Sequence, residues 1–539
     1  MAIKDDIENE EICSQGVQEP LIQGGKNRTD DVHKGHHWMV YLGTFVSVCG
    51  SYEFGTCAGY SSPTQSAIRS DLNLSLAEYS VFGSILSFGA MVGAITGGPI
   101  ADLISRKGTM RMASGFCVAG WLAIYFAQGA LALDLGRLAS GYGMGVFSYV
   151  VLTLPILVYR LILQKSLVIF FYALTIIKLL DDAKVPIFIA EISPKDLRGV
   201  LTAINQVNPK YYFCSSLMTY RTLFLSISIV SFLSSQLMIC AGVSVSFIIG
   251  NVLSWRTLAL IGLVPCAVLL LGLFFIPESP RWLAKRGRKK EFEAALQTLR
   301  GEDTDISEEA DEIQEYIETL EQLPKAKIFD LFQRRYFRSV AIGVGLMVFQ
   351  QFGGINGICF YTSNIFEEAG FSSSVGTITY AILQVIVTAI GATLVDKAGR
   401  KPLLLVSATG LVIGCLVVAI SFFLKVHDLA ASAVPILAVT GILLYIGAFS
   451  AGMGAVPWVV MSEIFPINIK GVAGGFATLV NWFGAWAVSY TFNYLMTWSS
   501  YGTFILYAAV NAIGIVFVVG VVPETKGKTL EQIQAAVNS

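Results

Sequence analysis

Three short charged motifs, which we call the first, second and third cassettes, occur twice in this 539-residue chain and in the same order. The pairs are DLISRK at 102–107 with DKAGRK at 396–401, EISP at 191–194 with EIFP at 463–466, and PES at 277–279 with PET at 523–525. Each third cassette closes a long apolar run. An ordered set of motifs that repeats between apolar runs indicates a duplicated membrane unit, built as two similar helical bundles.

Composition places this duplicated unit in a bilayer. Hydrophobic residues make up 54% of the chain and charged residues only 14%, with a mean hydropathy of +0.64. A soluble protein of this length cannot cover so much apolar surface, so we predict an integral membrane protein without a nucleic-acid partner. The nine cysteines show no Cys-x-x-Cys spacing, and no nucleophile, metal or nucleotide-binding cluster is apparent. We therefore expect no metal, no cofactor and no enzyme activity.

Ten apolar runs are long enough to cross a membrane, which takes about 20 residues. They cover 38–60, 79–101, 112–131, 257–276, 340–365, 376–395, 403–424, 434–461, 472–496 and 504–522. Two more spans between 136 and 251 complete two sets of six. The Lys and Arg residues of the cassettes then share one side with the N-terminus, which carries no signal peptide, so both termini are predicted to be cytosolic. The predicted fold is all-α, with twelve transmembrane helices in two six-helix bundles.

This count divides the chain into five parts. A cytosolic tail at 1–37 precedes an N-terminal bundle at 38–276, and a C-terminal bundle at 339–522 precedes a second cytosolic tail at 523–539. The segment 277–338 between the bundles is rich in charge but has apolar residues at helical spacing, so we predict a cytosolic helical linker there.

Six motifs in order resemble the sugar porter family of the major facilitator superfamily. They are the first cassettes, PESPRWL at 277–283, QQFGGINGICFY at 350–361, VPWVVMSEIFP at 456–466, NW at 481–482 and PETKGKTLEQI at 523–533. Within that family, GSYEFGTCAGYSSPTQ at 50–65 is similar to the first span of plant early-responsive-to-dehydration-like monosaccharide transporters. The resemblance covers nearly all of 38–533, and it implies the major facilitator fold and a transmembrane sugar transporter.

Two stretches of the N-terminal half depart from the repeat. The second copies of the three cassettes follow the first copies by 294, 272 and 246 residues, whereas a clean duplication keeps this offset nearly constant. Removing 151–184 and 207–236 makes the three offsets nearly equal and restores the family's fourth and fifth spans. Neither stretch contains glycine, which membrane helices use at their contacts. We interpret both as foreign inserts, of the kind that two retained introns in frame would produce; the alternative is a pair of lineage-specific loops.

A monosaccharide presents hydroxyl groups around a weakly apolar ring, so its site needs amides and one or two aromatic rings. Gln350, Gln351 and Asn356 supply amides in an otherwise apolar span, and on a single helix 351 and 356 lie about one and a half turns apart. The resemblance implies that these three residues bind sugar. It implies the same for Gln384, Trp458 and Asn481, and for either Gln206 or Gln236 on the fifth span. The competing interpretation of a lone glutamine in a span is contact between helices.

The resemblance also implies two gates. Phe360 and Tyr361 match an aromatic pair that gates the outer side. The inner gate consists of ion pairs, or of cations that only set the topology, at the cytosolic ends of the spans. Its residues are Asp102, Arg106, Lys107, Arg137, Glu191, Arg198, Asp396, Arg400, Lys401, Glu463 and Lys470. Ser105 stands where the family usually has glycine, which makes the first cassette of the N-terminal half the weaker match.

Several alternatives remain open at this point. Proton-coupled sugar porters carry an aspartate on the first span where this chain has Gly55, and Glu53 is predicted to point away from the pathway, so facilitated diffusion is favoured over proton symport. Two further alternatives for the function are a non-transporting sugar sensor and an inactive product of retained introns. A loose dileucine-type motif at 19–22 favours a vacuolar membrane over a plasma membrane. We expect a monomer in the lipid bilayer and a monosaccharide, most simply a hexose, as substrate.

Overall fold

The computed structural model describes residues 38–150, 236–301, 305–322, 328–466, 468–526 and 533. These residues form helices and connecting turns, and no strand occurs among them. Eight helices or joined helix pairs of the described chain are long and apolar enough to cross a membrane. With α1, α4, α5 and a shorter apolar helix at Gln236–Gly250 they occupy all twelve predicted positions. The prediction of an all-α fold with two six-helix bundles is confirmed.

The N-terminal half packs its helices around one apolar core. Its elements are α1 (Trp38–Gly59), α2 (Ser61–Leu72), α3 (Leu76–Ile104), α4 (Arg106–Tyr125), α5 (Ala130–Val150), the helix Gln236–Gly250 and α10 (Trp255–Phe275). Local signals mark their ends: Ser75 and Glu78 form a capping box at the start of α3, and Ser254 caps α10.

Glycines bring α3 and α5 into direct backbone contact. A Cβ atom placed on Gly93 would lie 2.2 Å from the Tyr142 carbonyl oxygen, and one placed on Gly141 would lie 2.1 Å from the Leu86 carbonyl oxygen. A methyl group cannot occupy either position unless the backbones separate. The two helices therefore pack as closely as membrane helices do at small-residue contacts.

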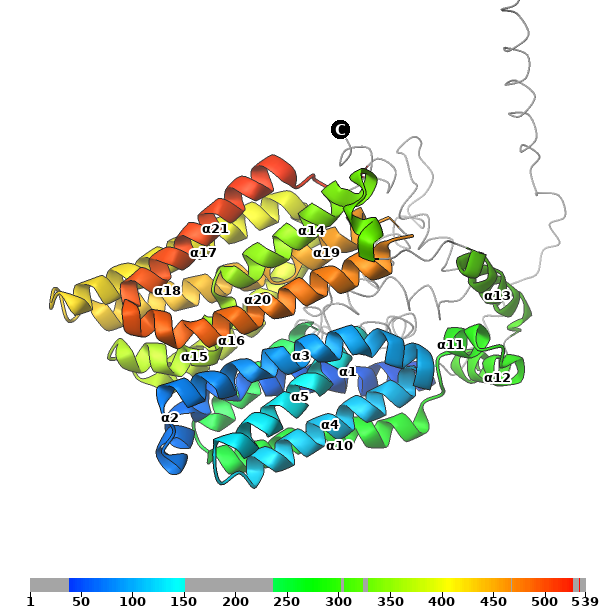
Figure 1. Ribbon diagram of the computed structural model, residues 1–539, viewed down its shortest axis with the longest axis horizontal. Helices are drawn as coiled ribbons and strands as arrows, with labels where there is room; N and C mark the ends of the chain where they lie inside the picture. The colour runs from blue at the N-terminus through cyan, green and yellow to red at the C-terminus, as the bar shows by residue number, and fades with distance from the viewer. Residues whose placement is uncertain are drawn as a thin grey trace, which may run out of the picture. The chain divides into compact units, whose positions relative to one another are not determined.

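The C-terminal half, like the N-terminal half, is a bundle of long helices joined by short turns (Figure 1). Its elements are α14 (Arg334–Phe352), α15 (Ile355–Glu368), α16 (Ser373–Ala398), α17 (Arg400–Val426), α18 (Val434–Ala448), the π-helical turn η4 (Phe449–Met453), α19 (Val456–Ile464), α20 (Lys470–Trp498) and α21 (Ser500–Val521). Two apolar runs that the sequence predicts as single spans are interrupted here. Gly354, with φ of +105°, separates α14 from α15, and η4 separates α18 from α19.

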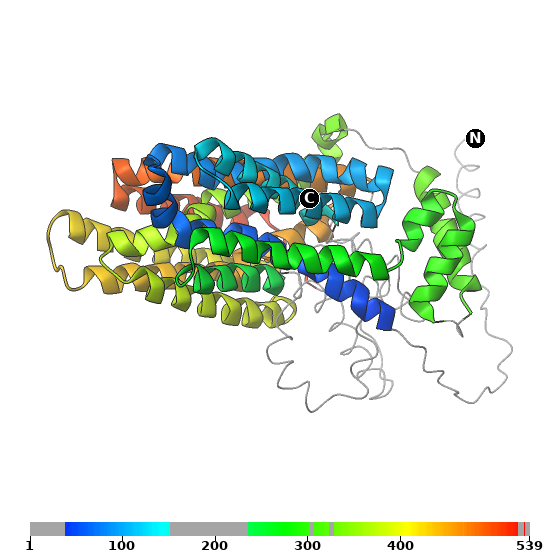
Figure 2. The ribbon, with the colours of Figure 1, turned by 90° about the horizontal axis from the view of Figure 1, so that it is seen from below.

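Three short helices, α11 (Pro280–Lys285), α12 (Lys289–Arg300) and α13 (Ser307–Gln322), follow α10. They share a small apolar core of their own, and a buried ion pair joins Arg300 Nη2 to Glu309 Oε1 at 2.6 Å. Trp282 Nε1 donates to the Asp102 carbonyl oxygen at 3.0 Å, which fastens α11 to the end of α3. Figures 1 and 2 both show these helices beyond that end of the N-terminal half. We call it the cassette end, and we call the opposite end of the spans the far end.

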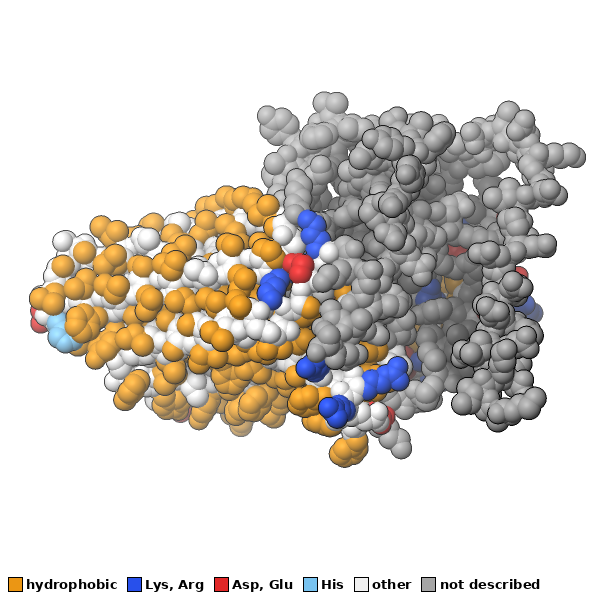
Figure 3. Space-filling model, turned by 90° about the horizontal axis from the view of Figure 1, so that it is seen from above, with side chains coloured by type: hydrophobic (Ala, Val, Ile, Leu, Met, Phe, Trp, Pro, Cys, Tyr) orange, Lys and Arg blue, Asp and Glu red, His pale blue; other side chains and the backbone are white. Residues whose placement is uncertain are grey.

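The surface agrees with a membrane position. Figure 3 shows a broad region of hydrophobic side chains, with Lys and Arg gathered near the cassette end and His at the far end. Apolar side chains such as Phe274 and Val516 are about 70% exposed. Exposed apolar area on this scale is stable only against lipid.

Candidate functional site

A cavity of about 240 Å³ lies between the two halves. Its polar lining residues are Ser51, Ser148, Gln236, Gln350, Gln351, Asn356, Tyr380, Gln384, Trp458, Asn481 and Trp482. No acidic or basic side chain lines it among the described residues. Its size is near the lower limit for a small-molecule site, and its lining of amides and aromatic rings suits a small neutral ligand.

The predicted amides meet in one network, although the predicted local structure is wrong. Gln351 and Asn356 do not share a continuous helix, because the chain turns at Gly354 between α14 and α15. This turn still brings them together: Asn356 Nδ2 donates to Gln351 Oε1, and Gln351 Nε2 donates to Asn481 Oδ1 at 2.7 Å. Three amides from α14, α15 and α20 are therefore oriented by one another toward the cavity.

Gln350 has a different partner. Its Nε2 donates to the carbonyl oxygens of Met453 and Gly454 at 2.7 and 2.9 Å. These oxygens lie at the interruption between η4 and α19, where regular helical hydrogen bonds are lost. Gln350 thus stabilises the broken tenth span while its side chain still lines the cavity.

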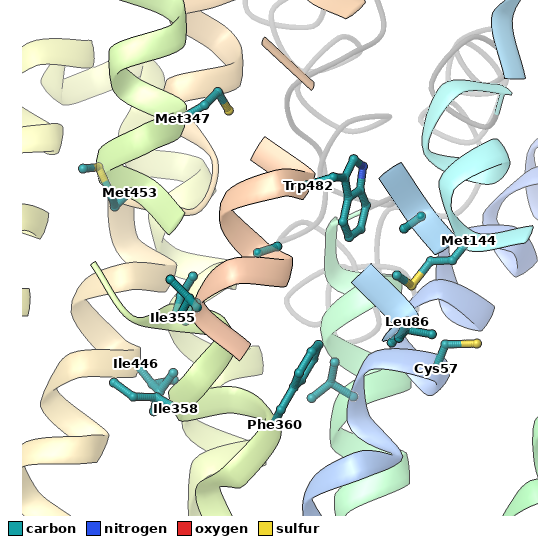
Figure 4. Packing of buried hydrophobic residues seen from close by; sticks show 14 of the residues in the cluster. Cys57, Leu86, Met144, Met347, Ile355, Ile358, Phe360, Ile446, Met453 and Trp482 are labelled. Carbon is teal, nitrogen blue, oxygen red and sulfur yellow. The ribbon is translucent and has the colours of Figure 1, made fainter. Parts of the chain in front are cut away.

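Aromatic rings enclose the amides from both halves. Phe54 of α1 and Trp482 of α20 lie with ring centroids 5.8 Å apart across the boundary between the halves. Phe360 and Trp458 also line the cavity. Figure 4 shows Trp482 and Phe360 opposite Met144 and Leu86 of the N-terminal half. The apolar faces needed for a sugar ring are therefore present.

The remaining predicted ligands divide between described and undescribed residues. Gln384 lines the cavity from α16, and its Oε1 is buried without a hydrogen-bond partner. Gln236 lines the cavity at the start of its helix, whereas Gln206 lies outside the described residues. Of the two glutamines that the sequence left open, only Gln236 can be placed.

A seal closes the far end. Tyr361 stacks on Phe492 with centroids 5.1 Å apart, and it meets Tyr79 of the other half edge-on at 6.5 Å. Tyr361 is fully buried, and its backbone departs from helical geometry, with φ of −121° and ψ of 18°. Its partner in the predicted pair, Phe360, faces the cavity instead. The two adjacent aromatic residues therefore have different positions: Tyr361 forms the seal, and Phe360 lines the cavity.

Hydrogen bonds between the halves strengthen this seal. Ser62 Oγ of α2 lies 2.9 Å from Ser363 Oγ of α15, and Asn493 Nδ2 of α20 donates to Ser80 Oγ of α3 at 2.8 Å. The sequence analysis missed these residues. Serine and asparagine within apolar spans are the signal that marks them, because a polar side chain in a membrane helix usually finds a partner on another helix.

The first cassettes form matching turns in the two halves. Ser105 has φ of +86° and ψ of 164°, and Gly399 has φ of +92° and ψ of 160°. Lys107 Nζ donates to the Ile276 carbonyl oxygen, and Lys401 Nζ donates to the Val519 carbonyl oxygen. Each cassette is thus tied to the end of the sixth span of its own half.

The third cassettes supply an acid to each turn. Glu278 Oε1 accepts from the Lys107 backbone N–H at 3.3 Å. Glu524 accepts from the backbone N–H groups of Arg400 and Lys401 at 3.1 and 3.0 Å. Partial burial disfavours the charged form of Glu524, but hydrogen bonds from backbone N–H groups outweigh it and lower the pKa of this carboxyl below its usual value.

The described ion pairs of the predicted inner gate lie within each half. Asp102 pairs with Arg106 at 3.1 Å, and Glu463 pairs with Arg400 at 3.0 Å. Lys470 Nζ donates to the Ser462 carbonyl oxygen at 2.7 Å. Glu191 and Arg198 lie outside the described residues, as does the side chain of Asp396.

Arg137 lies apart from these charges. It is fully buried in the N-terminal half, where its Nη1 donates to the Cys57 carbonyl oxygen at 2.8 Å and its Nη2 donates to Ser61 Oγ. The rings of Tyr60 and Phe82 lie within 5.5 and 5.0 Å of the guanidinium carbon. It is therefore held by neutral groups and aromatic rings, and not by the cassette residues.

Glu53 is buried in the same half and does not line the cavity. Its Oε1 accepts from Trp121 Nε1 at 2.6 Å and from the Cys57 thiol at 3.3 Å. Glu53, Cys117 and Cys266 form a compact group in which the atoms that could bind a metal ion lie within 4.8 Å of one another. These residues come from three helices, so no local spacing in the sequence announces the group.

Such an arrangement, two six-helix halves around a central neutral cavity, defines a membrane transporter of the major facilitator type. The chain belongs to the family described as "Sugar (and other) transporter", whose pattern it matches over residues 39–155 and 182–537. This family consists of transporters and not of enzymes. The resemblance inferred from the motifs is confirmed.

Curated relatives agree over nearly the full chain. Sugar transporter ERD6-like 7 from Arabidopsis thaliana is 64% identical over 526 residues, covering 98% of this chain and 99% of the relative. Sugar transporter ERD6-like 16 from the same plant is 52% identical over 542 residues, covering 100% and 99%.

Solved structures show the same fold at lower identity. The inward-open conformation of the xylose transporter XylE from E. coli superposes with a TM-score of 0.65 at 24% identity, covering 92% of this chain and 99% of that one. The proton:xylose symporter XylE bound to 6-bromo-6-deoxy-D-glucose gives 0.63 at 22% identity, covering 93% and 99%. At these identities the likeness establishes the fold alone.

Proposed function

We propose that this protein carries a monosaccharide, most simply a hexose, across a membrane as a monomer that works by alternating access. The observation that carries the proposal is the cavity between the halves, where Gln351, Asn356 and Asn481 form an amide network beside aromatic rings. Neutral hydroxyl groups need partners that both donate and accept, and amides do both. The names of the relatives, which are sugar transporters, support the same substrate class.

The seal supports the alternating-access part of the proposal. Contacts between the halves at Tyr361, Ser62 and Asn493 close the far end, while the described ion pairs of the cassette end lie within single halves. The contacts at the far end are those expected of an alternating-access transporter whose outer gate is closed. We also propose that the protein lies in the vacuolar or the plasma membrane. Its cassette end faces the cytosol, because Lys and Arg gather at that end.

The site is tested by uptake into liposomes that contain the purified protein. Gln351→Ala and Asn356→Ala should each lower sugar uptake about 5- to 150-fold, because leaving a buried hydroxyl unpaired costs about 1–3 kcal/mol. Asn364→Ala is the matched control, since Asn364 lies on α15 but bonds to Glu368 outside the cavity. Undiminished uptake in both amide variants would show that the sugar binds elsewhere.

We further propose facilitated diffusion. None of the described cavity-lining residues carries a carboxyl group, and Glu53 is directed into the N-terminal half. A coupling proton needs a titrating group that the pathway can reach. Uptake should therefore stop at equal concentrations and ignore a protonophore. Accumulation above the outer concentration, lost in Glu53→Gln, would show a proton symporter instead.

The segments 151–184 and 207–236 remain, in our proposal, inserts that impair the transporter. The family match omits residues 156–181, which supports the first insert. An insert within a span leaves backbone groups unpaired in hydrocarbon unless it loops out of the bilayer. Excising both brings Gln206 next to Leu237, in the place that Gln236 holds at the cavity, and should raise sugar flux per folded molecule in liposomes. Equal flux from both forms would show harmless loops.

A further inference from the structure

The helix Gln236–Gly250 and α16 run antiparallel along the boundary between the halves. Cys240 Sγ lies 3.5 Å from Thr388 Oγ1, and Ser244 Oγ donates to the Ala381 carbonyl oxygen at 3.1 Å. Just beyond the helix, Asn251 Nδ2 donates to Thr377 Oγ1 at 2.9 Å. We call this row of contacts the seam. It closes one wall of the cavity over about three turns of α16.

Two polar atoms inside the seam lack partners. Tyr380 Oη and Gln384 Oε1 are both buried without a hydrogen bond of normal geometry, since the Cys359 thiol beside the phenol is only a weak partner, and both residues line the cavity. They are four residues apart on α16, so their side chains lie on one face of the helix, with Cβ atoms about 5–6 Å apart. The Tyr380 ring is fully buried and packs on Phe247 of the opposite half at 5.2 Å. Phe247 thus fixes the position of the Tyr380 ring in the cavity wall.

We propose that Tyr380 and Gln384 together bind one hydroxyl group of the substrate, and that this hydroxyl supplies the hydrogen bonds that the two residues lack within the seam. The phenol donates to the substrate oxygen, and the same hydroxyl donates its hydrogen to Gln384 Oε1. The proposal rests on the proposed transport of a monosaccharide and deepens it. It predicts a preference for substrates that keep a free hydroxyl at this point over analogues that lack it.

Physical chemistry makes this pair selective. A hydroxyl is the smallest group that accepts and donates at once, so it satisfies both atoms without rearrangement. A deoxy analogue leaves both atoms without a partner in a buried place, because a C–H group replaces neither hydrogen bond. A site built to bind a hydroxyl rejects the analogue that lacks it much more strongly than an apolar pocket rejects an extra group.

The seam also links binding to the closed arrangement of the halves. Tyr380 and Gln384 belong to the C-terminal half, and the residues that pack around them, Cys240, Ser244 and Phe247, belong to the N-terminal half. A substrate held by Tyr380 therefore lies where the two halves meet. Binding there favours the state in which the seam is formed.

The test measures uptake of glucose and of its series of monodeoxy analogues into liposomes, using the full chain and Tyr380→Phe. Phenylalanine keeps the ring packed on Phe247 and removes only the hydroxyl group. We expect the KM for glucose to rise about 5- to 50-fold in this variant. One deoxy analogue should be poor for the wild type and should lose no further affinity in Tyr380→Phe, because the partner it lacks is already absent.

Tyr507→Phe is the matched control. Tyr507 Oη is also buried without a partner, but Tyr507 lies on α21 and does not line the cavity. This variant should keep the wild-type order of the analogues. Equal KM values for wild type and Tyr380→Phe, or deoxy penalties that the variant leaves unchanged, would overturn the proposal. If neither the full chain nor the form without 151–184 and 207–236 transports any monosaccharide, the proposed function fails and this inference fails with it.

Discussion

The two halves make the same turn at their first cassettes, but they hold it with different groups. In the N-terminal half, Ser105 adopts φ of +86° and its own hydroxyl accepts from the Gly108 backbone N–H at 3.0 Å. In the C-terminal half, Gly399 adopts φ of +92° and has no side chain, and the acid Glu524 reaches the first two N–H groups of α17. The free N–H groups at the helix start are thus paired by a serine hydroxyl and one distant acid in the N-terminal half, and by a distant acid alone in the C-terminal half.

One residue explains why the two solutions are not interchangeable. The third residue of α4 is Gly108, which has an N–H for the Ser105 hydroxyl to cap. The third residue of α17 is Pro402, which has none. A serine at 399 would find no N–H at the third position of α17, and the N–H of the second residue, Lys401, is already bonded to Glu524. Glycine with a close acid therefore stabilises the start of α17. Duplicated motifs can therefore diverge in pairs of positions while the backbone stays the same.

The largest effect should come from moving the N-terminal solution into the C-terminal half. In Gly399→Ser the new Cβ would lie 2.9 Å from Glu524 Oε2, in a backbone region that is nearly exclusive to glycine. Strain of about 1–3 kcal/mol and the displacement of Glu524 should lower the free energy of unfolding by roughly 3 kcal/mol. Thermal unfolding in detergent, followed by tryptophan fluorescence, measures the loss.

Adding Pro402→Gly to Gly399→Ser restores an N–H that the serine can cap. The double variant should recover about 1 kcal/mol of the loss, the usual worth of a helix cap. A double variant that is less stable than Gly399→Ser alone would contradict the role given to Pro402.

Next in size is the difference between the two acids. Glu524→Gln removes a charge that two N–H groups of a helix start stabilise, and it should cost about 1–2 kcal/mol. Glu278→Gln removes a charge that accepts a single, longer hydrogen bond from the Lys107 N–H, and it should cost less than half as much. Equal losses of melting temperature in the two variants would show that the halves do not differ in the way described.

The pH dependence of stability gives a smaller effect with a definite sign. The pKa of Glu524 is lowered in the folded chain. Its charged carboxyl therefore contributes fully to the free energy of unfolding above the ordinary glutamate pKa of about 4.3. This contribution is lost as pH falls below that value through the lower folded pKa. Between pH 6 and pH 3 the wild type should therefore lose more stability than Glu524→Gln, as melting temperatures measured at each pH will show. Parallel curves would mean that Glu524 titrates normally.

The smallest effect should come from Ser105→Gly, which gives the N-terminal half the glycine of its counterpart. Relief of strain at φ of +86° opposes the loss of the cap on Gly108, and glycine caps only a few tenths of a kcal/mol less well than serine. The variant should be more stable by at most about 1 kcal/mol. A clear loss of stability in the same melting assay would show that the hydroxyl cap outweighs the strain.

The sequence predicted the repeat, the twelve spans and the family, because these depend on local hydropathy and on motifs that survive in order. It also predicted which amides line the cavity. It did not predict the break at Gly354, since a glycine pair within an apolar run is compatible with a continuous helix. The interruption after the π-helical turn at Phe449–Met453 has a local signal that the sequence analysis did not use: Pro457 has no N–H to donate to the Met453 carbonyl four residues earlier. The partner of that carbonyl, Gln350, lies more than 100 residues away and has no local signal.

Dependence on residues far apart in the sequence also hid Tyr380 and the polar contacts of the seal, although Tyr361 itself was expected at the outer gate. Tyr380 is one of several tyrosines in apolar spans, and only its place beside Phe247 and the cavity distinguishes it. The contact between Ser62 and Ser363 joins residues 301 positions apart. Contacts between halves depend on how two bundles dock, which no periodicity within one span encodes.

The glycine contacts between α3 and α5 have a mechanical consequence. Where the Cα atom of Gly93 presses on the Tyr142 carbonyl, no layer of side chains remains that could shear, so the two helices act as one stiff plate. The packed part of α3 begins near Ser80, which bonds to α20, and the turn at Ser105 lies beyond Pro99. In the alternating-access cycle proposed above, we therefore expect the glycine-packed parts of α3 and α5 to move together as one rigid pair.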